Sequence, residues 1–88
     1  MYVEVNEEHI ANGTPESSES CAVALAIFER TGKRVFVCDD EIRWYREPRF
    51  LRTIEPPLCV RDFVRRFDAG EKVEPFGFEL DETLFGGS

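Results

Sequence analysis

The longest apolar run of the chain is CAVALAIF, at residues 21–28. Thr14, Pro15 and Glu16 precede it with a capping hydroxyl, a proline and an acid, which suit the start of a helix. Gly32 follows it as a helix stop. We therefore predict one long helix from residue 15 to about residue 30. Because this helix is apolar on almost every side, we expect a sheet, another helix or a partner subunit to cover both of its faces.

Shorter elements are predicted before this helix. Residues 2–5 alternate in polarity and predict a strand with Val3 and Val5 on one face. Asn6 is a good cap for a short helical turn at residues 7–11, which has two acids at its start and Gly13 after its end.

After the long helix, β-branched and aromatic residues predict strands at residues 35–38, 42–45 and 50–54. The acidic triplet at residues 39–41 and the Glu47-Pro48 pair predict the turns between them. Pro56 and Pro57 then start a second helix, in which Val60, Phe63, Val64 and Phe67 share one face. Gly70 ends this helix, and Asp62 can pair with Arg66 four residues on. A last strand is predicted at residues 75–80, with Phe76, Phe78 and Leu80 on one face.

This order of elements predicts an α+β fold, with a small, mainly antiparallel sheet of three to five strands and two principal helices packed on one face. Residues 1–85 are expected to form a single domain and residues 86–88 a flexible tail.

The chain has 88 residues, of which 42% are hydrophobic, and this is too apolar for a disordered protein. No apolar run approaches the roughly 20 residues that span a bilayer. The first residues lack the pattern of a secretory signal, and the three cysteines are widely spaced, so we expect a cytoplasmic protein.

The net charge of −7 is unevenly distributed. Residues 1–29 carry −6, residues 30–66 carry +4 and residues 67–88 carry −5. An acidic chain with a basic middle predicts a focused anion site or a charge-complementary protein contact, and argues against extended nucleic-acid binding. The alternative is intramolecular, with the acidic ends folded against the basic middle.

The most informative segment is RWYREPRFLR, at residues 43–52. Arginine forks recognise phosphate or carboxylate, and aromatic rings offer stacking surfaces. The predicted partner- or anion-binding residues are Arg43, Tyr45, Arg46, Arg49 and Arg52. In the alternative interpretation these arginines are the solvated edge of a sheet, whose core positions are Ile42, Trp44, Phe50 and Ile54.

Other chemistry has less support. Cys21, Cys38 and Cys59 are isolated and His9 is the sole histidine, so no metal site is predicted. His9 could serve as a base, with a serine at 17, 18 or 20 or with Cys21 as nucleophile, but no catalytic pattern requires this. No glycine-rich phosphate loop or dinucleotide fingerprint is present, and no cofactor is predicted.

Five short stretches carry a resemblance: EHI at residues 8–10 with Gly13, CAVALA at 21–26, FDAG at 67–70, VEPF at 73–76 and FEL at 78–80. They resemble small uncharacterised proteins of actinobacterial bacteriophages and their hosts. Many of these relatives carry a C-x-x-C pair before the apolar helix. Here Ser18 stands at its first position and Cys21 at its second, so a metal or redox role of the pair is not expected. The resemblance implies a phage accessory protein, a class in which inhibitors of host components are common.

We therefore expect a non-enzymatic binding protein, a phage accessory factor that inhibits a host defence component by direct binding. The partner is a host protein or an anionic nucleotide. A nucleotide-binding sponge that uses the same basic segment is the alternative, and a small hydrolase based on His9 is the third possibility. We also expect a homodimer, because the helix at residues 22–28 has more apolar faces than a small sheet can cover.

Overall fold

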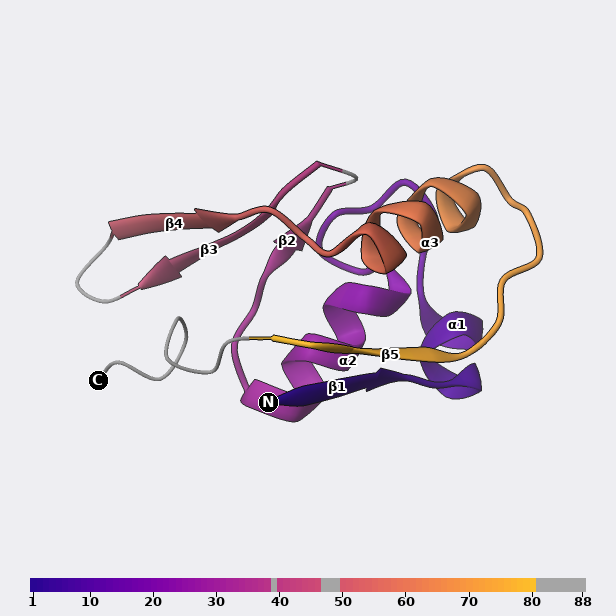
Figure 1. Cartoon of the computed structure of the whole chain (residues 1–88), viewed down its shortest axis with the longest axis horizontal. Coiled ribbons are helices and arrows are strands. Elements are labelled where there is room, and N and C mark those ends of the chain that lie inside the picture. Colours follow the sequence, from indigo (N-terminus) through magenta and orange to yellow (C-terminus); the bar gives the residue numbers. More distant parts are fainter. Residues whose placement is uncertain (39, 47–49, 81–88) are drawn as a thin grey trace.

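A computed structural model describes residues 1–38, 40–46 and 50–80 of the chain (Figure 1). Its helices are α1 (Glu7–Asn12), α2 (Ala22–Thr31) and α3 (Leu58–Asp68). Its strands are β1 (Tyr2–Val5), β2 (Phe36–Val37), β3 (Ile42–Arg46), β4 (Phe50–Ile54) and β5 (Phe76–Glu79). The predicted α+β class is confirmed. The expected tail at residues 86–88 lies outside the described residues.

The described strands form two antiparallel sheets. One pairs β1 with β5, the first and last strands, and the other is the meander β2-β3-β4. The backbone N–H of Leu80 donates to the carbonyl of Met1 at 2.8 Å, which extends the pairing of β1 and β5 by one step. The predicted strands therefore exist, but pairing between distant parts of the chain separates them into two sheets.

The core lies between these sheets and the helices. Helix α2 packs against α1, β1 and β2, and five of its ten residues are buried. The face of the β1–β5 sheet that carries Val3, Val5 and Phe78 belongs to the same core cluster. Helix α3 joins this cluster through Phe63, whose ring centroid lies 4.7 Å from that of Phe76 on β5. The two principal helices thus share the inner face of the β1–β5 sheet.

Helix α2 begins at Ala22, so the prediction that it starts at residue 15 is wrong. Glu16 has a φ of 64°, in the left-handed region, and its N–H donates to Oδ1 of Asp68 at 2.8 Å. The N–H of Thr14 donates to the carbonyl of Ser20 at 2.8 Å, which closes the segment as a loop. The N–H of Val37 donates to the carbonyl of Ser18 at 2.8 Å, so this loop lies beside β2. These backbone bonds replace the helical ones that the sequence pattern predicted.

The other helix signals are confirmed. Asn6 caps α1, and Gly32 ends α2 with a φ of 74°. In α3 the predicted face of Val60, Phe63, Val64 and Phe67 is buried. The predicted pair between Asp62 and Arg66 forms at 3.2 Å. None of the helices in the described part of the chain has both the length and the apolar character needed to cross a membrane.

Candidate functional site

The β3–β4 hairpin carries the predicted basic site. In its register Arg43 pairs with Thr53 and Trp44 pairs with Arg52. Because paired residues share a face and neighbours along a strand alternate, Arg52 lies on the face of Trp44 and Arg43 on the opposite face. Trp44 is 2% exposed and belongs to the core, whereas Arg52 is exposed. The hairpin therefore presents these two arginines in different directions rather than as one cluster.

The other predicted site residues lie toward the far end of the same hairpin. Tyr45 and Arg46 occupy the β3 positions that pair with Leu51 and Phe50. Arg49 lies outside the described residues. Figure 1 shows the Arg46–Phe50 end of the ladder at one end of the long axis of the molecule, away from α1 and α3.

Two arginines of the basic middle have local ion-pair partners. Nε of Arg43 lies 3.2 Å from Oε1 of Glu41, and Nε of Arg66 lies 3.2 Å from Oδ2 of Asp62. Both acids belong to the basic middle itself. These two ion pairs therefore do not involve the acidic ends of the chain, in contrast to the intramolecular alternative.

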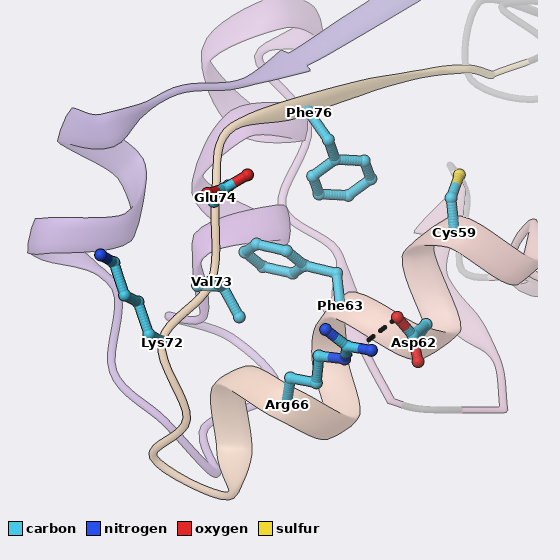
Figure 2. Close-up of a pocket in the computed structure, with 8 residues that line it drawn as sticks. All are labelled: Cys59, Asp62, Phe63, Arg66, Lys72, Val73, Glu74 and Phe76. Carbon is cyan, nitrogen blue, oxygen red and sulfur yellow. Dashed lines mark ion pairs between the residues drawn. The ribbon is translucent and has the colours of Figure 1, made fainter.

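A hollow lies at the other end of the molecule, between α3 and the segment before β5 (Figure 2). Its volume is about 510 Å³. Phe63 and Phe76 lie against each other in its wall, and its charged lining residues are Arg66, Lys72, Asp62 and Glu74. Arg66 is paired with Asp62 there, so the lining is balanced in charge and does not select an anion. Sequence reasoning missed this hollow because its lining combines α3 with the irregular segment before β5, whose path no periodic pattern predicts.

His9 is held by hydrogen bonds at both ring nitrogens. Its Nδ1 accepts from the N–H of Asn6 at 3.0 Å, and its own N–H donates to Oδ1 of Asn6 at 3.0 Å. Since Nδ1 is an acceptor, the neutral ring carries its hydrogen on Nε2, which lies 2.8 Å from Oε2 of Glu29 on α2. The side chain is 8% exposed. This arrangement is a capping box that also connects α1 to α2, and the spacing N-x-x-H was its signal in the sequence.

The cysteines differ in their surroundings. Cys21 is buried, Cys38 is half-buried and Cys59 is exposed, and all three are free thiols. Burial raises the pKa of the Cys21 thiol, so this group stays protonated at neutral pH. Within residues 1–38, 40–46 and 50–80, no group of three or more His, Cys, Asp and Glu side chains is placed to hold a metal ion.

A second groove lies along one side of α2, between this helix and the segment that leads into β2. Its volume is about 300 Å³. It is lined by Glu19, Ser20, Ala24, Leu25, Phe28, Arg34, Val35 and Phe36. Phe28 is 46% exposed, and the guanidinium carbon of Arg34 lies 5.9 Å from the centroid of its ring. The described residues thus supply only part of the expected cover over α2.

No protein-family model matches the chain, and neither the curated proteins nor the solved structures contain a match.

Proposed function

We propose that the protein is a non-enzymatic binding protein, a phage accessory factor that inhibits a host defence component in the host cytoplasm. The observation that supports this best is the position of the β3–β4 hairpin. It reaches one end of the molecule with Arg52 exposed, and Arg43 pairs with Glu41, which lies directly before β3. The hairpin is then the contact for an acidic surface of a host protein.

The charge distribution supports a hairpin contact. Residues 1–29 and 67–88 carry −6 and −5, so most of the molecule repels an acidic partner. The basic middle attracts it, and most of that positive charge lies in the hairpin segment at residues 43–52. Repulsion from the acidic parts and attraction to this segment together orient the encounter toward the hairpin. An acidic protein surface therefore suits the molecule better than a long nucleic acid, which would also meet the acidic parts.

The two alternatives have less structural support. In a nucleotide sponge, Trp44 and Tyr45 would supply stacking surfaces, but Trp44 lies in the core at 2% exposure. In a hydrolase, His9 would need a ring nitrogen for the substrate, whereas both of its nitrogens are engaged within the fold.

We also propose that the protein works as a homodimer. Leu25 is half-buried and Phe28 is 46% exposed on a helix whose other apolar residues are buried. An uncovered apolar stripe of this kind favours a protein contact. Light scattering over a range of concentrations tests this proposal, and a monomeric mass at every concentration would contradict it.

The hairpin proposal is tested by capture from an actinobacterial lysate on the immobilised protein. Arg52→Ala and Arg43→Ala each remove one positive charge, from opposite faces of the hairpin. Lys72→Ala is the matched control, because it removes the same charge beside the hollow of Figure 2, away from the hairpin. We expect the wild type and Lys72→Ala to capture the same host protein. At least one hairpin variant should lose it, and the variant that does so identifies the contact face.

A panel of cyclic and linear nucleotides separates the alternatives. The protein is incubated with the panel and denatured, and the released ligand is analysed. An intact bound nucleotide would support the sponge, and an altered one would support the hydrolase. If no nucleotide binds, and if capture survives both hairpin substitutions, the hairpin is a solvated edge and the proposed contact is wrong.

A further inference from the structure

The groove on α2 has an arrangement of charges that suits a second copy of the same chain. Leu25 and Phe28 lie one helical turn apart on its floor, with Val35 and Phe36 beside them. Glu19 stands before the N-terminal end of α2, and Arg34 follows its C-terminal end. The groove is thus apolar along its length, with an acid toward one end and a base toward the other.

We propose that two copies of the chain pair through this groove, with their α2 helices antiparallel about a two-fold axis near Leu25. The proposal rests on the homodimer proposed above and names its contact surface. In an antiparallel pair the N-terminal end of one helix meets the C-terminal end of the other. Glu19 of each copy then faces Arg34 of the other copy, and the two ion pairs are related by the two-fold axis.

The apolar part of the groove fits the same geometry. In a two-fold contact each residue near the axis meets its own counterpart, so Leu25 meets Leu25 and Phe28 lies to either side of the axis. Ala24 also lines the groove, and its small side chain allows two helices to approach closely. The exposed part of Phe28 is then covered by the second copy.

The size of the surface predicts weak pairing. The groove is lined by eight residues, whereas a stable interface has roughly 20 to 30 residues on each side. Contacts smaller than this range are transient. We therefore expect a monomer–dimer equilibrium in the micromolar range and no permanent dimer.

Charge reversal tests the pairing, with sedimentation equilibrium of the full chain as the measurement. Glu19→Arg places a positive charge against Arg34 at both cross-contacts, and Arg34→Glu places a negative charge against Glu19. We expect each variant alone to lose association at least tenfold. In an equimolar mixture of the two variants both cross-contacts have opposite charges again, so the mixture should regain the association of the wild type. Only a contact between two copies predicts this rescue.

Phe28→Ser probes the apolar floor and should lower the association constant. Leu58→Ser is its control, because Leu58 is 79% exposed on α3, away from the groove. This control should associate like the wild type. Melting temperatures of all variants show whether a lost dimer is only a lost fold, and the rescued mixture excludes that explanation directly.

The outcomes separate this proposal from the others. A wild type that stays monomeric at all concentrations would overturn both the homodimer and its interface. If the wild type dimerises and Glu19→Arg dimerises equally well, or if the mixture stays monomeric, the α2 interface is wrong and the homodimer stands. Arg52→Ala should dimerise normally, so failure of the hairpin proposal leaves this result unaffected.

Discussion

His9 occupies the third position of α1, where a helix cap more often has glutamate or glutamine. Its imidazole accepts from the backbone of Asn6, as those residues would, and also reaches Glu29 on α2. One buried side chain therefore both begins a short helix and connects it to the central one. The sequence had offered His9 as a catalytic base. Its contacts with Asn6 and Glu29 instead give it a structural role.

His9→Ala should lower the free energy of unfolding by about 1 to 3 kcal/mol, because it leaves the N–H of Asn6 without its acceptor and opens a small cavity. His9→Gln keeps an acceptor at this position and should lose less. The pair with Glu29 contributes little to the difference, since the Glu29 side chain is 70% exposed. Urea denaturation followed by circular dichroism measures both variants. Equal losses would show that the capping bond does not stabilise α1.

The thiols should react with iodoacetamide in the order Cys59, Cys38 and Cys21. The thiolate is the reactive form, and burial raises the pKa of Cys21 while also closing access to it. Mass spectrometry of the folded protein should find Cys59 labelled first and Cys21 labelled only after unfolding. Labelling of Cys21 at the rate of Cys59 would contradict the burial of the start of α2.

The same pKa shift has a defined effect on stability. Because the folded-state pKa of Cys21 lies above the ordinary value of 9.0, the unfolded chain ionises first as the pH rises. The protonated Cys21 thiol therefore makes its full contribution to the free energy of unfolding below pH 9.0. This contribution is lost as the pH rises from there through the folded-state pKa. When the pH is raised from neutral to about 10, the free energy of unfolding should therefore fall less in Cys21→Ala than in the wild type.

At the scale of elements, periodic patterns were readable from the sequence and non-local backbone contacts were not. Helix α3 was predictable because its apolar residues repeat at helical spacing and prolines precede it. The start of α2 was not, since the hydrogen bond from Glu16 to Asp68 and the bond from Val37 to Ser18 join segments that are distant in sequence. The division into two sheets was not predictable for the same reason, because it depends on the pairing of β1 with β5, the first and last strands.

The candidate site, too, was predictable only in its local part. The sequence identified the basic segment, and the register of β3 and β4 then placed Arg43 and Arg52 on opposite faces. The hollow of Figure 2 and the groove on α2 could not be predicted, because each combines residues from separate elements.

Phe63 should be the residue on α3 whose loss is most damaging. It is 6% exposed, and its ring contacts those of Phe67 and Phe76 at centroid distances of 5.7 and 4.7 Å. Phe63→Ala should therefore lower the free energy of unfolding by about 3 to 5 kcal/mol, a large part of the roughly 5 to 15 kcal/mol of a small domain. Leu58→Ala on the same helix is the control and should change it by less than about 0.5 kcal/mol. Near-wild-type melting of Phe63→Ala would show that α3 is not joined to β5 through this ring.

At the scale of the whole molecule, the two proposed contacts use different regions. The hairpin reaches one end of a body 38 Å long, and the groove follows α2 near its centre. A dimer formed through α2 carries two hairpins, so a partner with two acidic surfaces would be held by both. Two linked contacts bind more tightly than either one alone when their spacing fits the partner.

The electrostatic basis of hairpin binding can be tested before any partner is known, with a peptide of ten glutamates as the probe. The peptide should shift the amide NMR signals of β3 and β4 and leave those around Lys72 unchanged, because the acidic parts of the molecule repel it. About 0.5 M salt should abolish the shifts, since the screening length then falls well below 10 Å. Arg52→Ala should reduce them with little change in melting temperature, because an exposed charge contributes under about 1 kcal/mol to stability. Equal shifts at both ends of the molecule, or shifts that persist in high salt, would mean that the basic middle does not direct an acidic partner to the hairpin.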